Sequence, residues 1–314
     1  YTLFKKNWVK FIIMVFLFTA VTSPFVVLFG PFNNVKRAVI GAILQSRHPQ
    51  YITWLFSNDE LQSILGTVGV VKSQDLFKFN AREDKDLKLE KIESSRYVGY
   101  VLEIPDPRRI QVATAANIQE KGDTTSNIAK MNGAVAAING GGFHDPNGTG
   151  TGRLPYGFIL HEGDYIIGKD VGPDESVDFV GFSKSGNLIA GNYDKTELAD
   201  MKAMEGITFG PPLIVDGKKM ITDGDGGWGV GPRTAIGQRK DGTVLFVVID
   251  GRQPGYSLGA TLRDVQDVLY EKGAYIAANL DGGSSSTLYL NGKVVNKPAD
   301  LLGERMIPTA FIVK

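Results

Sequence analysis

The longest apolar stretch of the chain lies near its N-terminus and carries no charge. It spans residues 11–32, FIIMVFLFTAVTSPFVVLFGPF, which is long enough for a helix of about 20 residues to cross a bilayer. Lys5, Lys6 and Lys10 precede it, and the positive-inside tendency then keeps the N-terminus cytoplasmic and exports the rest. We predict a single-pass anchor in the cell membrane within residues 1–33, and an extracellular remainder. A cleaved signal peptide is the alternative, but the apolar run is longer than a usual h-region.

The next segment, residues 34–94, has a helical and then a charged pattern. In its first half Ser57 is placed to cap a helix, with Glu60 three residues later. The charged run AREDKDLKLEKIE at 81–93 is typical of a solvated linker. We therefore predict stalk helices and a linker at 34–94, followed by a compact domain at 95–314.

Within residues 95–314, short apolar runs alternate with clusters of Gly, Asp, Asn and Pro, as in strands joined by tight turns. YVGYVLEI, near Tyr97, is the expected first strand. Two helices interrupt the strands, TTSNIAKMNG at 124–133 and TLRDVQDVLYEKG at 261–273, which has one apolar stripe and a glycine stop. We predict an α+β fold, a mixed β-sheet domain with a few helices, preceded by one N-terminal transmembrane helix.

Two segments of this domain repeat one pattern. GAVAAIN at 133–139 and GAYIAAN at 273–279 match at four of seven positions, and each lies between a helix and a glycine-rich elbow. Parallel crossovers would bring the C-terminal ends of both strands to one sheet edge, where open α/β sheets bind ligands. We predict two pseudo-repeated strand–helix–strand units whose elbows face each other across a cleft.

The second elbow lies in ANLDGGSSSTLYL, residues 278–290, and allows two interpretations. Asp-Gly between apolar runs indicates a hairpin, a signal that the chain also carries at Asp216-Gly217, Asp241-Gly242 and Asn291-Gly292. A glycine pair also lets successive backbone N–H groups converge on one anion, and the serines add donors. We predict that the chain reverses here and that this turn is itself the site.

Composition restricts the available chemistry. The absence of cysteine removes thiol nucleophiles, thiolate metal sites and disulfides. Lys plus Arg equals Asp plus Glu, 34 each, so no net field favours nucleic acid as a partner. The segment DGDGG at 223–227 resembles part of a calcium loop but lacks the later acidic ligand. We predict no metal and no other cofactor.

Four motifs, in the order GAVAAINGGGF, GPRTAIG, VVIDGRQPG and AANLDGGSSSTL, resemble the phosphodiester glycosidase family. The resemblance covers residues 95–314. The family includes an enzyme that removes N-acetylglucosamine from the mannose 6-phosphate tag of lysosomal enzymes, and bacterial exopolysaccharide-associated proteins. Ser284 stands where the family pattern often has a third glycine, which alters how closely the elbow can hold an anion.

The resemblance implies hydrolysis of a sugar-1-phosphodiester, with an N-acetylhexosamine released from a phosphomonoester of cell-surface polysaccharide or teichoic-acid-like material. We assign Asp281 as base or nucleophile, and Asp250 or His144 as the second acid/base group. Phosphate and sugar contacts are expected from Asn139, Gly140, Gly141, Arg233, Thr234, Arg252, Asn279, Gly282, Gly283 and Ser284.

Two other classes of function fit the same residues. A non-catalytic protein that binds phosphosugar polymers would need the arginine and the glycines but no acid/base group. A structural component of a polysaccharide-export assembly would use the stalk helices as its contact surface. In all three cases the expected partners are a sugar phosphate and, through residues 11–32, the membrane.

Overall fold

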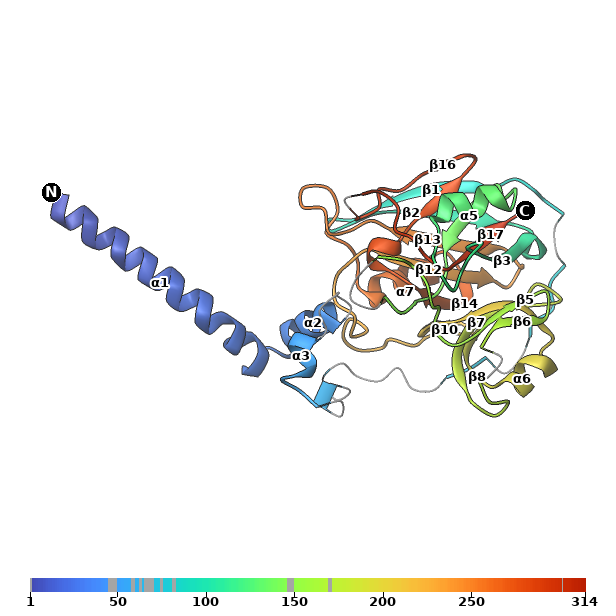
Figure 1. Ribbon diagram of the computed structural model, residues 1–314, viewed down its shortest axis with the longest axis horizontal. Helices are drawn as coiled ribbons and strands as arrows, with labels where there is room; N and C mark the ends of the chain where they lie inside the picture. Colours follow the sequence, from blue (N-terminus) through green and yellow to red (C-terminus); the bar gives the residue numbers. More distant parts are fainter. Residues whose placement is uncertain are drawn as a thin grey trace. The chain divides into compact units, whose positions relative to one another are not determined.

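The computed structural model of the chain describes it as two compact units (Figure 1). The described residues are all except 1, 45–49, 58–59, 62–63, 65–70, 74–75, 81–82, 146–149, 169–170 and 301. The first unit comprises Tyr1–Thr67 with Gly227–Gly229, and the second comprises Val68–Gly226 with Val230–Lys314.

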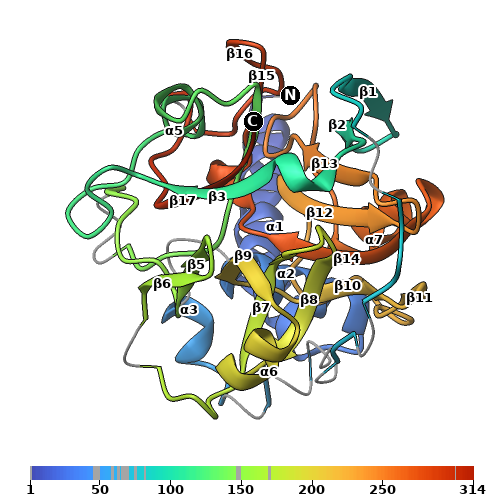
Figure 2. The same ribbon diagram turned by 90° about the vertical axis from the view of Figure 1, so that its right-hand side faces the viewer.

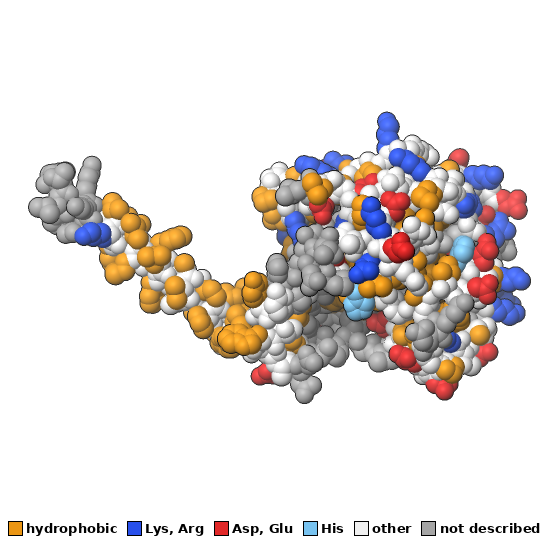
Figure 3. Space-filling model, viewed as in Figure 1, with side chains coloured by type: hydrophobic (Ala, Val, Ile, Leu, Met, Phe, Trp, Pro, Cys, Tyr) orange, Lys and Arg blue, Asp and Glu red, His pale blue; other side chains and the backbone are white. Residues whose placement is uncertain are grey.

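The first unit is helical, with α1 (Thr2–Phe29), α2 (Asn33–Leu44) and α3 (Gln50–Thr53). In α1 the span Trp8–Phe29 is long and apolar enough to cross a membrane, and Figure 3 shows its described surface to be almost entirely hydrophobic. A signal sequence meets the same criteria, so the helix is confirmed while its orientation stays a prediction. The predicted cap is also confirmed, because the Ser57 backbone N–H donates to Glu60 Oε2 at 2.8 Å.

The described residues of the second unit form three sheets, in which all neighbouring strands are antiparallel. The seven-stranded sheet has the order β1 (Lys88–Glu93), β2 (Val98–Ile104), β13 (Val244–Ile249), β12 (Arg233–Arg239), β14 (Ala274–Leu280), β10 (Pro212–Val215), β11 (Lys218–Lys219). A five-stranded sheet has the order β16 (Lys293–Val294), β15 (Leu288–Leu290), β4 (Ala136–Asn139), β17 (Thr309–Val313), β3 (Ile110–Thr114). The third has the order β6 (Asp164–Ile167), β5 (Ile159–His161), β9 (Ala203–Thr208), β7 (Val177–Ser183), β8 (Leu188–Tyr193).

Helices α5 (Thr125–Met131), α6 (Lys195–Asp200) and α7 (Leu262–Glu271) pack against these sheets, and Figure 2 shows α6 beside β7 and β8. Thr124 and Thr261 cap the two helices that the sequence predicts, α5 and α7. The sheet-dominated fold with few helices is thus confirmed.

The pseudo-repeated units are present, but they lie in different sheets. In the first, α5 links β3 to β4, and both strands flank β17. In the second, α7 links β13 to β14, and both strands flank β12. Each pair is parallel because each strand runs antiparallel to the one between. The prediction of a single shared sheet edge is therefore wrong, because each unit has its own sheet and its own inserted central strand.

Both faces of the second sheet are buried, which explains its continuous apolar runs. Ile138 and Phe311 point into the core shared by the three sheets, while Ala137 and Ile312 pack with Ile128 of α5. Successive side chains of a strand point to opposite faces, so the residues of β4 and β17 alternate between these two environments. The rigid ends of these strands carry the residues of the candidate site.

Three of the four predicted hairpins form, and the fourth does not. Pairs β10–β11, β12–β13 and β15–β16 enclose the Asp-Gly and Asn-Gly turns. Beyond β14, however, Gly283–Ser285 forms a 3-10 turn that leads to β15 in another sheet. The segment DGGSSS therefore carries the chain from one sheet to the next, because Gly283, at φ +62°, redirects the backbone without closing a two-strand ladder.

The charged run at 81–93 is not wholly a linker. Its second half is β1, which pairs with β2 from Lys88 opposite Glu103 to Glu93 opposite Val98. The strand is an exposed edge strand, where alternating charge is tolerated and discourages pairing with another chain. The compact unit also begins well before Tyr97, at Val68.

Candidate functional site

The two elbows touch each other at the ends of β4 and β14. The backbone N–H of Asp281 donates to the oxygen of Gly140 at 3.0 Å, and Asn139 Nδ2 donates to the main-chain oxygen of Asp281 at 2.6 Å. The predicted proximity of the elbows is confirmed, although they meet through direct hydrogen bonds where the sequence predicts a cleft.

Asn139 is the centre of this junction and is fully buried. Its Oδ1 accepts hydrogen bonds from Thr234 Oγ1 at 2.8 Å and from the Thr287 backbone N–H at 3.1 Å. One amide thus ties together β4, β12 and the two ends of the DGGSSS segment. Asn139 and Thr234 use these atoms within the protein, so the geometry favours a positioning role for both over the predicted substrate contact.

The glycines of the first elbow serve close packing. The N–H groups of Gly140 and Gly141 donate to the main-chain oxygen and the Oγ1 of Thr309, at 2.8 and 3.1 Å. A Cβ at Gly140 would lie 2.5 Å from Thr309 Oγ1, so no larger residue fits. The expectation that these N–H groups form an anion nest is wrong, because β17 already occupies both donors.

The second elbow likewise directs its amides inward. The Gly283 N–H donates to the oxygen of Pro232 at 2.9 Å, and the Gly282 N–H donates to the carboxylate of Asp281. Positive charge around this elbow therefore has to come from side chains.

Asp281 carries the most perturbed carboxylate of the two elbows. Burial raises the pKa of Asp281 to about 6. This effect is partly offset by groups that lower the pKa, namely the Ser285 hydroxyl, the Arg305 charge, the Gly282 N–H and the Arg252 charge. The residue as a whole is half-buried, and its carboxyl group lies deep among these partners. A carboxylic acid whose pKa is raised toward neutral pH is suited to acid/base chemistry.

Arginine side chains from the start of β12 and from two loops surround the second elbow. Arg233 Nη1 and the two Nη atoms of Arg252 lie 3.8 and 3.4 Å from where Cβ atoms of Gly282 and Gly283 would stand. Arg305 Nη1 donates to Ser284 Oγ at 3.1 Å. Three guanidinium groups thus border three successive residues beside the Asp281 carboxylate, an arrangement suited to binding a phosphate.

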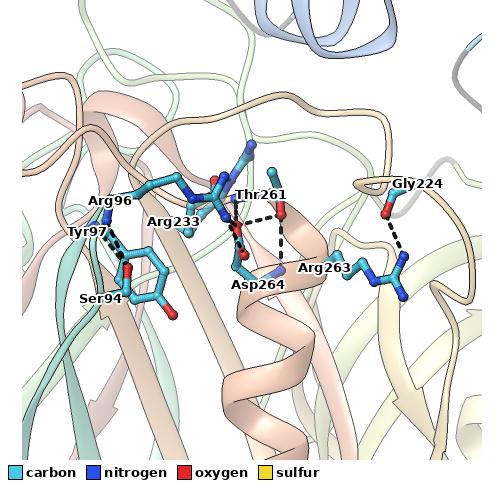
Figure 4. Close-up of polar contacts among 9 residues, drawn as sticks. Ser94, Arg96, Tyr97, Gly224, Arg233, Thr261, Arg263 and Asp264 are labelled. Carbon is cyan, nitrogen blue, oxygen red and sulfur yellow. Dashed lines mark hydrogen bonds and ion pairs between the residues drawn. The ribbon is translucent and has the colours of Figure 1, made fainter. Parts of the chain in front are cut away.

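Arg233 is anchored at the start of α7. Its Nε donates to the oxygen of Ala260 at 3.0 Å, next to the capping box that Thr261 forms with Asp264 (Figure 4). Asp264 also holds Arg96 at 2.7 Å in this cluster (Figure 4). Burial and the neighbouring Arg252 lower the pKa of Arg233 to about 10, so it stays cationic at neutral pH.

The sequence motifs did not identify Arg305. Its Nη2 forms an ion pair with Asp145 Oδ2 at 2.7 Å, and its guanidinium lies 4.9 Å from the centre of the Phe143 ring. Arg305 therefore connects the first elbow segment to Ser284 of the second. No local signal marks it, since it stands in an irregular segment between β16 and β17.

Asp250 has a different environment from Asp281. Its Oδ1 accepts hydrogen bonds from Asn296 Nδ2 at 2.9 Å and the Lys297 N–H at 3.0 Å, and its Oδ2 accepts one from Tyr256 at 3.0 Å. Burial raises its pKa, opposed by these hydrogen bonds. The contacts tie together two loops, so the geometry favours a positioning role over the predicted acid/base role.

The remaining predicted residues divide between the site and the scaffold. His144 is exposed, and its ring packs edge-on against Tyr156 with centroids 4.5 Å apart. Asn279 is buried and its Nδ2 donates to the oxygen of Gly210 at 3.0 Å, which binds β14 to the segment before β10. Among the described residues, no group of three or more metal-ligating side chains occurs.

Comparisons with known proteins agree with this arrangement. Residues 132–314 match the Phosphodiester glycosidase family model. The chain is 32% identical over 197 residues to the SPbeta prophage-derived uncharacterized protein YomE of Bacillus subtilis (strain 168), covering 60% of this chain and 29% of that protein. It is 25% identical over 203 residues to the N-acetylglucosamine-1-phosphodiester alpha-N-acetylglucosaminidase of Bos taurus, covering 58% of this chain and 36% of the bovine protein.

The fold is also similar to a solved structure. The zebrafish N-acetylglucosamine-1-phosphodiester alpha-N-acetylglucosaminidase catalytic domain, auto-inhibited by its pro-peptide, superposes with a TM-score of 0.62 at 22% identity, over 76% of this chain and 86% of that one. The chain spans only about a third of the length of the two curated relatives. Since the family model matches more than half of the sequence, the chain belongs to the phosphodiester glycosidase family.

Proposed function

We propose that this protein hydrolyses sugar-1-phosphodiesters at the second elbow, with Asp281 as the reacting carboxylate. The observation that supports this most directly is the carboxylate of raised pKa next to three guanidinium groups. A phosphodiester carries one negative charge beside the carbon that is attacked, so its recognition needs cations close to an acid/base group. A protein that only binds the polymer has no use for a carboxylate that titrates near pH 6.

The arginines hold the phosphate in this proposal. Arg252 and Arg305 place their charges beside Gly283 and Ser284, while the Nε of Arg233 is held by the oxygen of Ala260. Guanidinium groups pair with two phosphate oxygens at once, which fixes the orientation of the scissile bond. Negative charge that develops on the departing phosphate strengthens these contacts, so they stabilise the transition state more than the ground state.

Asp281 acts at the anomeric carbon as base or nucleophile. In the base form of the reaction, the water oxygen bonds to C1 while the bond from C1 to the phosphate oxygen breaks. The bonding electrons stay on that oxygen, and the water proton passes to Asp281 and then to solvent. The phosphomonoester has a second pKa of about 6 and so departs without a strong acid, which limits what His144 has to supply as the second group.

Binding of substrate also tunes Asp281. Arg305 and Arg252 lower the pKa of Asp281 in the free protein. A bound phosphate offsets their charge, so the pKa of Asp281 rises in the complex and the carboxylate becomes a stronger base at the moment of reaction.

The sugar and the location are part of the same proposal. The name of the bovine relative supports N-acetylglucosamine as the sugar. The apolar helix α1 supports a single-pass anchor with the catalytic unit outside the cell, acting on cell-surface polysaccharide or teichoic-acid-like material.

The test is hydrolysis of UDP-N-acetylglucosamine and of sugar-phosphate polymers in H₂¹⁸O, followed by mass spectrometry of the products. Cleavage at the anomeric carbon releases free N-acetylglucosamine and leaves no ¹⁸O on the phosphate, and Asp281→Asn abolishes the release. Label on the phosphate, or release of N-acetylglucosamine 1-phosphate, would show a different reaction class. Tight binding without any product would favour the binding protein.

A further inference from the structure

Beyond the phosphate side of the site lies Tyr156, which the sequence motifs did not single out. Tyr156 is 41% exposed, so its ring is available to a ligand. It stands where the chain returns from the loop that leaves the first elbow after Asp145.

The backbone holds Tyr156 firmly at the first elbow. Its N–H donates to the oxygen of Gly142 at 3.1 Å, and the His144 N–H donates to the oxygen of Leu154 at 2.9 Å. Phe143 forms a β-bridge with Pro155 between these two hydrogen bonds. The position of Tyr156 is therefore fixed by the same strand end that carries Asn139 and Gly140.

The ring itself is braced on two sides. A Cβ at Gly142 would lie 2.8 and 2.9 Å from Cδ2 and Cε2 of Tyr156, and 2.6 Å from Cε2 of Phe209. The third glycine of the GGG motif is thus needed to seat the ring. On another side the His144 ring packs at an interplanar angle of 82°. A ring fixed in this way loses little entropy when a ligand stacks on it.

Tyr156 is also near the reacting carboxylate. Gly140, two residues before Gly142 in the first elbow, accepts the hydrogen bond from the Asp281 N–H. In agreement with this, burial and the Asp281 charge raise the pKa of Tyr156. Arg305 contacts Phe143, Asp145 and Ser284. The segment next to Tyr156 is therefore connected to the second elbow through Arg305.

We propose that the exposed ring of Tyr156, braced by Gly142 and His144, is the platform on which the pyranose ring of the substrate stacks. The axial C–H face of a hexopyranose is apolar and complements an aromatic face, while the phenol hydroxyl offers a polar group to the sugar hydroxyls. This subsite rests on the proposed function, because it divides one site into a sugar half at Tyr156 and a phosphate half at Gly282–Ser284. Asp281 lies between the halves, where the scissile bond has to be.

The experiment separates the halves with the full chain and does not depend on turnover. Binding of free N-acetylglucosamine, N-acetylgalactosamine, glucose and mannose is titrated by NMR, and inorganic phosphate is titrated separately. Tyr156→Ala is expected to weaken binding of the preferred sugar about tenfold, as for loss of an aromatic stacking contact of ~1–1.5 kcal/mol, and to leave phosphate binding unchanged. Tyr156→Phe keeps the ring and is expected to stay within about threefold of the wild type. Arg252→Gln is expected to show the opposite pattern.

A matched control is Tyr270→Ala, since Tyr270 is 46% exposed on α7 and contacts Lys219. Thermal melting of each variant checks that the fold is kept. The proposal is overturned if Tyr156→Ala binds the sugar as well as the wild type, if it loses phosphate binding equally, or if the wild type binds none of the sugars. Sugar binding at Tyr156 without hydrolysis would refute the proposed reaction alone, and hydrolysis indifferent to Tyr156→Ala would refute the subsite alone.

Discussion

Asn139 Nδ2 donates a hydrogen bond of 2.6 Å to the main-chain oxygen of Asp281, across 142 residues of sequence. This bond joins the ends of two strands from different sheets at the position where the carboxylate of Asp281 projects. The position of Asp281, the proposed reacting group, is thus set by a buried amide that need not touch the substrate.

Replacing Asn139 by Ala is expected to lower the free energy of unfolding by about 2–4 kcal/mol, because the Thr234 hydroxyl, the Thr287 N–H and the Asp281 oxygen all lose their partner. Thr234→Val removes only one of these hydrogen bonds and should cost about 1 kcal/mol. Urea unfolding of both variants measures the difference. Equal midpoints for Asn139→Ala and the wild type would refute the role of the junction.

Asp281→Asn is expected to stabilise the fold while abolishing turnover. The folded pKa of about 6 lies above the ordinary value of 3.8, so ionisation costs the native state more than the unfolded one. That cost is absent below about pH 4, grows between pH 4 and 6, and is complete above pH 6, where it is on the order of 3 kcal/mol. Chemical unfolding at pH 4.5 and pH 7.5 should show the gain mainly at the higher pH. A gain of equal size at both would contradict burial as its cause.

The pH dependence of kcat/KM reports Asp281 in the free protein. If the ionised carboxylate is the base or nucleophile, activity falls as the pH drops through about 6. Arg305→Gln removes a charge that lowers this pKa, so the acid limb should move to higher pH. Arg305→Lys keeps the charge and should leave the limb close to that of the wild type, which separates the electrostatic effect from lost contacts with Ser284.

Asp250→Asn distinguishes the two aspartates. An amide cannot accept all the hydrogen bonds from Asn296, Tyr256 and the Lys297 N–H, so stability and activity should both fall, by about 1–3 kcal/mol in unfolding free energy. The acid limb of kcat/KM should nevertheless keep its midpoint. Complete loss of turnover in a variant of wild-type stability would return Asp250 to the acid/base role.

Truncation tests where the folded unit begins. A fragment of residues 68–314 keeps β1 and the hydrogen bond from the Tyr193 hydroxyl to the oxygen of Ser73 at 2.8 Å. A fragment of residues 95–314 loses both and uncovers the edge of β2, so it should melt at a lower temperature and aggregate more readily. Melting curves of the two fragments compare them directly, and identical behaviour would show that 68–94 adds nothing to the fold.

The sequence by itself determined the local elements and the family. Periodicity and capping specified α5 and α7, turn chemistry specified three hairpins, and the uncharged run specified α1. These features depend on neighbours within a few residues, so they are written in the local pattern. The ordered motifs around Asp281 and Arg233 were sufficient to identify the family.

Only the tertiary structure decided how the site is assembled. Short apolar runs do not encode which strands pair, so the three sheets and the inserted strands β12 and β17 could not be read from the chain. The first glycine elbow does not form an anion nest because Thr309 of β17 accepts the hydrogen bonds of its N–H groups, and in the second elbow the Gly283 N–H donates to the oxygen of Pro232. Arg305 and Tyr156 reach the site through long-range packing and leave no local motif. The raised pKa of Asp281 has the same origin, because burial is a property of the folded surroundings and not of the residue.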